Sequence, residues 1–231
     1  MTQRLKLPER LSVIAGFISK RASVIDIGTD HGFLPVYLAQ NSSAARIIAT
    51  DISEGSLNAA RRNAAKYGVT ASIEFILTPG LDGIEEKKIN TIVIAGLGGE
   101  TIASILSKAV WIKERRIKLI LQPQSKIDEL CGFLRLFGYI FSNAEVVRDN
   151  GRYYIVIVAA TGKSESFESP EMELYSIISK KRNPLLANYI DTLINKTQST
   201  AAASKISNPA RYGSMQIRLE ELRSIKEVSH W

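Results

Sequence analysis

Three ionisable side chains stand close together in one short segment near the N-terminus. The segment VIDIGTDHGFLP, residues 24–35, is predicted to begin as a buried strand, to continue as a glycine-containing loop and to end in a helix. Such a loop offers free backbone N–H groups at the start of the helix, which is typical of nucleotide-binding proteins. It carries Asp26, Asp30 and His31. Because two carboxylates would repel a pyrophosphate, we expect a cationic ligand here.

Polar or glycine-rich residues also follow the next three apolar segments. Asp51 follows the second, where a carboxylate either accepts hydrogen bonds from both hydroxyls of a ribose or caps the following helix. TPGLDG, residues 78–83, follows the third, and its Asp82 is either an adenine ligand or a turn former. AGLGGE, residues 95–100, follows the fourth, and its three glycines exceed what a tight turn needs. They predict an open floor for a planar ring.

The elements that position these residues follow an alternating pattern. Helical patterns separate five short segments of buried, β-branched character, namely 23–27, 46–50, 72–77, 91–96 and 118–123. This alternation predicts a parallel sheet with helices on both faces. Two further strands, 144–148 and 152–160, are separated only by Asp149–Gly151 and therefore form an antiparallel hairpin. The pattern predicts an α/β, class I methyltransferase (Rossmann-like) fold, with a mostly parallel seven-stranded sheet and a terminal hairpin.

S-adenosylmethionine fits these residues better than a dinucleotide does. A strict G-x-G-x-x-G loop needs a second glycine two residues after Gly28, where this chain has Asp30. The sulfonium and ammonium groups of S-adenosylmethionine are favoured by nearby carboxylates. We therefore expect S-adenosylmethionine as cofactor, and we predict no metal site.

The chain is expected to contain two parts. The segment TGKSESFESP, residues 161–170, has the composition of a linker. We expect a methyltransferase domain with a basic N-terminal helix over 1–162, and a helical hairpin resembling a short coiled coil over 163–231. Apolar residues at three- and four-residue spacing support helices in the second part, and Asn183–Pro184 is expected to break or kink them.

Composition and charge restrict the function classes. The 231 residues contain no apolar run long enough to span a membrane, no secretory signal pattern and a single cysteine, Cys131. These features predict a cytoplasmic protein without a membrane partner. The net charge is +7, and residues 1–21 alone hold five basic side chains and one acidic. Such a concentration is typical of proteins that bind a polyanion, although it also occurs on ordinary solvated surfaces.

Five segments together resemble the bacterial tRNA (adenine(22)-N(1))-methyltransferase family. They are LKLPERL, DIGTDHGFLP, IAGLGG, LILQP and DNGRYYIVIVA, and the resemblance runs from about Leu5 to Ala160. The chain departs from the family at Thr78-Pro79, where Gly-Asp or Gly-Asn is common, and at Leu97, Asn90 and Gln124. The resemblance implies methyl transfer from S-adenosylmethionine to ring nitrogen 1 of an adenosine in the D-arm of tRNA.

The resemblance and the local chemistry together give the candidate site residues. The catalytic candidates are Asp30, which would stabilise the cationic product ring and accept a proton from its exocyclic amine, and His31, which would contact the base or orient Asp30 unless it is an ordinary loop histidine. The cofactor candidates are Asp26, Gly28, Thr29, Asp51, Ile52, Gly80, Asp82, Ala95, Gly96 and Leu97. The RNA-binding candidates are Arg4, Lys6, Arg10, Gly98, Gly99 and Arg152.

Two other functions remain open at this stage. A small-molecule methyltransferase would share the fold and the cofactor but would not need the basic N-terminus. A non-catalytic RNA-binding protein would not need the complete set of acids. For the enzyme, the target base must swing out of folded tRNA, and Phe33, Tyr153 or Tyr154 either stack on it or pack in the core. We expect a monomer or a weak homodimer.

Overall fold

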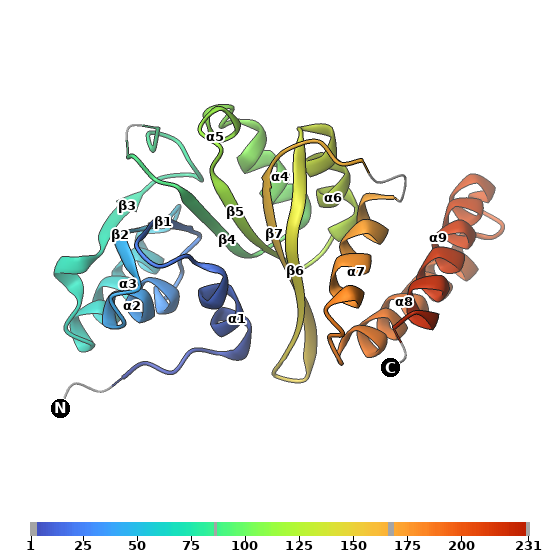
Figure 1. Ribbon diagram of the computed structural model, residues 1–231, viewed down its shortest axis with the longest axis horizontal. Helices are drawn as coiled ribbons and strands as arrows, with labels where there is room; N and C mark the ends of the chain where they lie inside the picture. The colour runs from blue at the N-terminus through green and yellow to red at the C-terminus, as the bar shows by residue number, and fades with distance from the viewer. Residues whose placement is uncertain (1–3, 86, 166–168, 230–231) are drawn as a thin grey trace.

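A seven-stranded sheet forms the centre of the computed structural model, which describes residues 4–85, 87–165 and 169–229. The strands are β1 (Ala22–Ile27), β2 (Ala44–Asp51), β3 (Glu74–Leu77), β4 (Thr91–Leu97), β5 (Lys118–Pro123), β6 (Tyr139–Asp149) and β7 (Arg152–Thr161). Their order in the sheet is β3-β2-β1-β4-β5-β7-β6 (Figure 1). Strands β1 to β5 are parallel, whereas β7 is antiparallel to both β5 and β6. The predicted fold class is confirmed.

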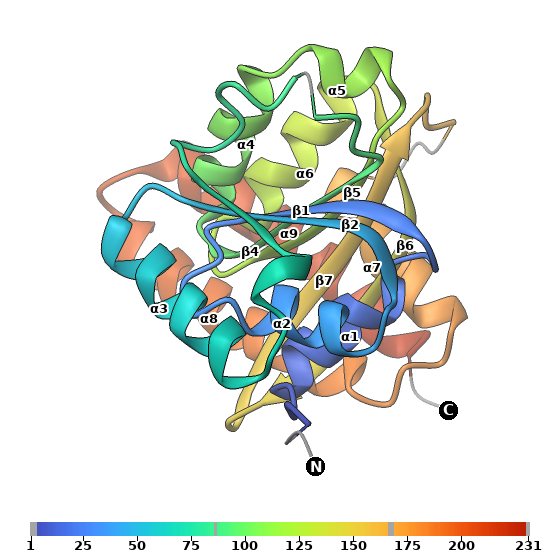
Figure 2. The same ribbon diagram turned by 90° about the vertical axis from the view of Figure 1, so that its left-hand side faces the viewer.

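Helices cover both faces of the sheet (Figure 2). The bounds are α1 (Glu9–Phe17), α2 (Phe33–Gln40), α3 (Glu54–Lys66), α4 (Gly99–Ser107), α5 (Trp111–Glu114), α6 (Ile127–Leu136), α7 (Pro170–Lys180), α8 (Leu186–Ser204) and α9 (Pro209–Glu227). Helices α1, α2 and α3 lie on one face, and α4, α5 and α6 lie on the other. The central strands β1, β4 and β5 are mostly buried on both sides, which explains their continuous apolar character.

Alternate residues of each central strand belong to different cores. In β1, Val24 packs toward α1 and α2, whereas Ile25 packs toward α4 and α6. In β4, Val93 belongs to the same core as Val24, and Ile92 belongs to the same core as Ile25. Successive side chains of a strand point to opposite faces, so one continuous apolar segment supplies both layers.

The strand order reverses at β1, because β2 lies on one side of it and β4 on the other. Helix α3, which follows β2, and helix α4, which follows β4, lie on opposite faces of the sheet. In sheets of this kind, a crevice opens beyond the carboxyl ends of the strands at the point of reversal. The loops that follow β1, β2 and β4 therefore meet at one edge of the sheet.

The hairpin between β6 and β7 has a two-residue turn. Asp149 pairs with Arg152, and the turn residues Asn150 and Gly151 have φ values of 48° and 78°. Asn-Gly favours this left-handed conformation, and the resulting turn matches the twist of the two strands. The predicted antiparallel hairpin is confirmed, and β6 begins earlier than predicted, at Tyr139.

The C-terminal part contains three helices. Helix α7 packs against β6 and α6, and its Met172, Leu174 and Tyr175 belong to the same core cluster as the sheet. Helices α8 and α9 pair with each other at the end of the molecule opposite β3 (Figure 1). Residues 166–168 of the predicted linker lie outside the described residues, and the domain boundary at residues 162 and 163 stays a prediction.

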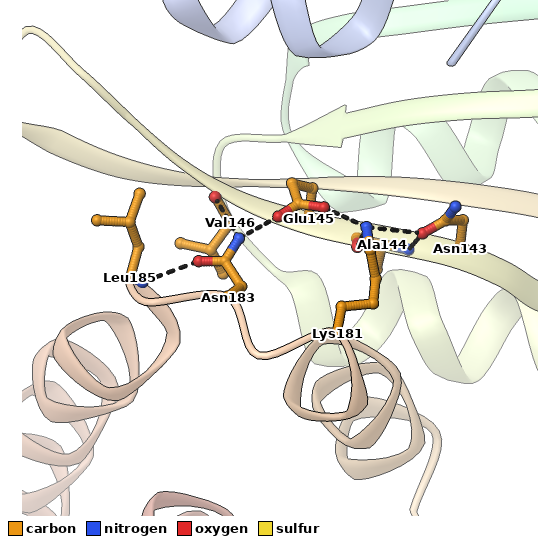
Figure 3. Close-up of polar contacts among 7 residues, drawn as sticks. All are labelled: Asn143, Ala144, Glu145, Val146, Lys181, Asn183 and Leu185. Atoms are coloured by element: carbon orange, nitrogen blue, oxygen red, sulfur yellow. Dashed lines mark hydrogen bonds and ion pairs between the residues drawn. The ribbon is translucent and has the colours of Figure 1, made fainter. Parts of the chain in front are cut away.

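Polar contacts hold the turn between α7 and α8 against β6 (Figure 3). Asn183 is buried, donates from Nδ2 to the Val146 carbonyl at 3.0 Å and to the Glu145 carboxylate, and accepts from the Leu185 amide at 2.8 Å. Lys181 donates to the Ala144 carbonyl at 3.1 Å and pairs with Glu145. Buried polar groups require partners, and this turn satisfies them with β6 backbone. Among the described residues, we find no helix with the length and apolar character needed to cross a membrane.

Candidate active site and cofactor cavity

A cavity of about 670 Å³ opens at the edge of the sheet where β1, β2 and β4 end. All the catalytic and cofactor candidates line it, namely Asp26, Gly28, Thr29, Asp30, His31, Asp51, Ile52, Gly80, Asp82, Ala95, Gly96 and Leu97. The volume is within the usual range for a site that encloses a small molecule. The structure thus brings together residues that come from four separate loops.

Asp26 is the most buried carboxylate of the cavity, with 6% of its surface exposed. Burial raises its pKa to about 7; the hydrogen bond from Thr29 Oγ1 to Asp26 Oδ2, at 2.7 Å, lowers the pKa, and the nearby Asp51 charge raises it. A buried acid of this kind loses the solvation of its charged form, so a cation beside it would restore favourable electrostatics. This environment fits a cationic ligand.

Asp51 is oriented by two backbone amides. Its Oδ2 accepts from the Asp30 amide at 3.0 Å, and its Oδ1 accepts from the Ser53 amide at 2.9 Å. A carboxylate oxygen accepts more than one hydrogen bond, so both oxygens keep capacity for a ligand's hydroxyl groups. The helix cap is Ser53, whose hydroxyl accepts from the Ser56 amide. Asp51 therefore does not cap α3, which was the alternative left open by the sequence.

Asp30 and His31 stand at the mouth of the cavity. Their side chains are 73% and 55% exposed, and His31 Nε2 lies 3.8 Å from Asp30 Oδ1. The His31 ring stacks on Phe33, with 5.7 Å between centroids. Asp30 has a φ of 51°, a conformation that Asp and Asn adopt more readily than most residues. Both residues line the cavity and are exposed to solvent.

Glycine is required in this loop by close packing. Gly32 has a φ of 67°, and a Cβ at this position would lie 2.7 Å from the Ala60 Cβ on α3. The close approach brings the start of α2 beside α3, and Asn63 of α3 donates from Nδ2 to the His31 carbonyl at 2.8 Å. Helix α3 therefore fixes this loop through Ala60 and Asn63.

The loop after β3 forms another wall of the cavity. Thr78 is buried, and its hydroxyl donates to the Asp82 carbonyl at 2.9 Å, which closes the loop on itself. Gly80 has a φ of 70°, and a Cβ there would lie 3.1 Å from Ile105 on α4. Asp82 is exposed at the rim. The Thr78-Pro79 departure from the family pattern thus lies on the cavity surface.

The three glycines after β4 occupy different environments, so the expected common floor is only partly correct. Gly96 lines the cavity, whereas Gly98 and Gly99 do not appear among its lining residues. A Cβ on Gly99 would lie 2.2 Å from the Lys126 carbonyl oxygen, and Gly99 is buried. Tight packing of α4 against residues 125–126 therefore requires glycine at position 99, and the assignment of Gly99 to RNA binding stays a prediction. The local sequence does not reveal this packing.

Sequence reasoning missed Gln122 and Asp149 as polar partners of Arg10. Arg10 lines the cavity and donates from Nη1 to Gln122 Oε1 at 3.0 Å. Its Nε lies 3.8 Å from Asp149 Oδ2, and its guanidinium lies 5.6 Å from the Tyr154 ring centroid. The only sequence signal for Gln122 is a polar residue inside the buried segment LILQP.

The other basic candidates lie outside the cavity lining. Arg4, Lys6 and Arg152 are exposed, the first two before α1 and the third at the start of β7. Phe33 lines the cavity, and Tyr153 packs against the sheet core. The ring of Tyr154 lies against the Arg10 guanidinium. Within the described residues, no group of three or more His, Cys, Asp or Glu side chains is placed to hold a metal ion.

The fold and the cavity agree with a comparison against known protein families. A family model described as a methyltransferase domain matches residues 7–157. The chain belongs to this methyltransferase family. The match includes every residue that lines the cavity and ends within β7.

Two relatives of this methyltransferase are named as tRNA methyltransferases, one of them as putative. The tRNA (adenine(22)-N(1))-methyltransferase of Bacillus subtilis is 29% identical over 231 residues, which cover 96% of this chain and 97% of that protein. A putative tRNA methyltransferase of Mycoplasma genitalium is 34% identical over 157 residues, covering 66% of this chain and 69% of that protein. The resemblance inferred from the five sequence motifs is confirmed.

Solved structures agree with this relationship over the whole chain. The B. subtilis m1A22 tRNA methyltransferase TrmK has a TM-score of 0.84 and 27% identity, covering 96% of this chain and 100% of that chain. TrmK of M. capricolum in complex with S-adenosyl-homocysteine has a TM-score of 0.80 and 27% identity, covering 97% and 99%. The coverage includes the C-terminal helices of this methyltransferase.

Proposed function

We propose that this methyltransferase transfers a methyl group from S-adenosylmethionine to nitrogen 1 of adenosine 22 in tRNA. The observation that carries the proposal is the cavity at the end of β1, which combines a buried acid of raised pKa with an exposed Asp30–His31 pair at its mouth. The full-length similarity to a tRNA (adenine(22)-N(1))-methyltransferase supports the acceptor.

The residues of the cavity fit S-adenosylmethionine. We assign Asp26 to the cationic part of the cofactor, because its burial makes a neighbouring positive charge favourable. We assign Asp51 to the ribose hydroxyls, because two amides fix its orientation. The exposed Ile52 and the rim residue Asp82 would border the adenine. When bound, the cofactor supplies an electrophilic methyl group.

The remaining cofactor candidates act through backbone and shape. Five of them line the cavity with small groups or main chain, which allows close approach of a ligand. They are Gly28, Gly80, Ala95, Gly96 and Leu97. Thr29 holds Asp26 through the 2.7 Å hydrogen bond. These assignments follow from the position of each residue in the cavity.

Asp30 and His31 are proposed to serve the acceptor base. Nitrogen 1 of neutral adenine already carries an in-plane lone pair, so no strong base is needed before attack. The product ring is cationic, and the Asp30 carboxylate would stabilise that charge and accept a proton from the exocyclic amine. Alignment of the base with the methyl group would supply most of the rate.

Substrate RNA is proposed to approach over the exposed basic residues that precede α1. Arg4 and Lys6 are exposed there, and Arg152 is exposed beside the β6–β7 turn. Phosphate contacts of this kind fix the position of a nucleic acid without reading its sequence. We propose that Gly98, at the start of α4, borders the path of the flipped base. We also propose a cytoplasmic location and a monomer or weak homodimer.

The first experiment is methyl transfer from labelled S-adenosylmethionine to unmodified tRNA transcripts. The panel includes a matched transcript in which adenosine 22 is replaced by guanosine, and the product is digested to nucleosides. Label recovered as 1-methyladenosine, and lost with the replacement, would support the proposal. Cofactor binding without transfer to any tRNA would contradict it and would favour a small-molecule acceptor. A protein that binds tRNA but does not bind S-adenosylmethionine would favour a non-catalytic RNA-binding protein.

A further inference from the structure

The cavity has two ends of opposite chemical character. Carboxylates of Asp26 and Asp51 lie at the end formed by β1 and β2. At the end formed by β4, a Cβ built on Gly96 would lie 3.6 Å from Arg10 Nη1 and also 3.6 Å from Gln124 Nε2. Two hydrogen-bond donors therefore converge at the β4 end, so a group placed there must present acceptor atoms.

Arg10 is fixed at this end by contacts from three strands. Gln122 of β5 accepts from Nη1, and it stands opposite Ala95 in the pairing of β5 with β4. Asp149 at the end of β6 lies near Nε, and Tyr154 of β7 lies under the guanidinium. Held by a hydrogen bond, an ion pair and an aromatic ring, the planar guanidinium has lost much of its rotamer freedom.

The partners of Arg10 are themselves constrained. Gln122 is fully buried, and its Nε2 donates to the Pro123 carbonyl at 2.9 Å, which directs its Oε1 toward Arg10. The Asp149 side chain is 13% exposed. Buried polar side chains of this kind are retained only when their hydrogen bonds are made, so the arrangement is pre-organised before substrate binds.

We propose that Arg10 contacts the acceptor nucleotide itself, and that Gln122 and Asp149 are positioning residues that hold its guanidinium for that contact. This inference rests on the proposed function and gives it an acceptor-side residue. It differs from a phosphate contact to the tRNA body, because the guanidinium lines the cavity that the nucleotide would enter. Its partner would be an acceptor atom of that nucleotide, on the base edge away from nitrogen 1 or on its own phosphate.

Kinetic measurements on variants distinguish a contact with the acceptor nucleotide from a contact with the tRNA body. A contact made in the reacting complex affects kcat, whereas a general phosphate contact affects tRNA affinity and its salt dependence. Arg10→Lys keeps the charge and removes the planar fork, and Asp149→Asn keeps the shape and removes the charge. Lys20→Ala is the matched control, because Lys20 is an exposed cation of the same N-terminal segment, beyond the end of α1.

We expect Arg10→Lys to lower kcat by about tenfold or more, with KM for tRNA, the salt dependence of KM and S-adenosylmethionine affinity changed less than about twofold. Asp149→Asn should lower kcat by a smaller factor. The double variant should be no slower than Arg10→Lys alone, because both substitutions disturb one contact. Lys20→Ala should match the wild type.

Three results would overturn the inference. If Arg10→Lys raises KM and lowers the salt slope by about one while kcat is unchanged, Arg10 is a phosphate contact to the tRNA body. If the effects of the two substitutions multiply, Asp149 does not act through Arg10. If the variants lose cofactor binding or their thermal transition, the cluster is structural. A wild-type protein that methylates no tRNA would instead contradict the proposed function and the inference together.

Discussion

The carboxylate of Asp51 accepts a hydrogen bond from the backbone amide of Asp30 at 3.0 Å. This contact joins the end of β2 to the loop after β1. Through it Asp51, the candidate residue for binding a ribose, fixes the backbone of Asp30, the candidate catalytic residue. Binding of a ribose and positioning of Asp30 are therefore coupled through one side chain. Replacing either Asp51 oxygen by an amide nitrogen would remove one of its two backbone contacts, with Asp30 or with Ser53.

Cofactor affinity should depend on pH through Asp26. In the ligand-free protein the pKa of this carboxyl is raised to about 7, so it is mostly protonated near pH 6 and mostly ionised above pH 7.5. A cationic cofactor favours the ionised form, so its dissociation constant should fall about tenfold between about pH 6 and pH 7.5. Calorimetry in two buffers of different ionisation enthalpy would also detect release of a proton on binding.

Asp26→Asn is the control for this dependence. The amide oxygen still accepts the hydrogen bond from Thr29, but the group does not titrate. Cofactor binding should become weaker, and its change over this pH range should disappear. The folded pKa is above the unfolded value, so the native carboxyl destabilises the ligand-free protein as pH rises from about 4 to about 7. Near pH 8, Asp26→Asn should therefore raise the thermal transition, and an unchanged transition would argue against a buried charge.

Removing the Asp30 carboxylate should slow the chemical step. Asn is the best replacement, because the backbone has a φ of 51° and Asn tolerates that conformation. We expect Asp30→Asn to lower the single-turnover rate of methyl transfer by about a hundredfold, in line with the usual effect of a general base. Cofactor affinity should change little. A variant with the wild-type rate would remove Asp30 from the mechanism and leave alignment as the source of catalysis.

Gly32→Ala should disturb the packing of the cofactor loop on α3. A Cβ would lie 2.7 Å from Ala60, at a φ of 67°. Backbone strain and the clash together should reduce the free energy of unfolding by about 2 to 4 kcal/mol. Urea unfolding would measure it, and cofactor affinity should fall as well. Gly83→Ala is the matched control, because Gly83 has a φ of 70° and an added Cβ meets nothing within 4 Å. Equal losses in both variants would show that strain alone acts.

The turn between α7 and α8 should depend on Asn183. Asn183→Ala removes two donors and one acceptor that are satisfied by β6 and by Leu185 (Figure 3), and it leaves the Val146 carbonyl without this partner. The free energy of unfolding should fall by about 1 to 3 kcal/mol. Hydrogen exchange should increase in α8 and α9 more than in β1 and β2. Asn188→Ala, at an exposed position of α8, is the control and should behave like the wild type. Uniform exchange changes would contradict local anchoring.

Much of the fold and of the cofactor side follows from local sequence. Short apolar segments of β-branched residues gave the strands, and Asn150–Gly151 gave the hairpin because its residues adopt positive φ. Asp26 and Asp51 were found because polar residues at the ends of parallel strands meet at one edge of the sheet. These signals depend on periodicity and turn chemistry, which are properties of neighbouring residues.

The tertiary structure alone decided the contacts around Arg10 and the packing of the C-terminal helices. Arg10 and Gln122 are 112 residues apart and meet because α1 packs across β6 and β7. Gly99 is needed for contact with the backbone at residue 126, and α7 joins the core of the sheet through Met172 and Tyr175. The sequence by itself determined which elements form and which acids line the cavity. Contacts between distant elements depend on how all the layers pack together, and no local pattern encodes them.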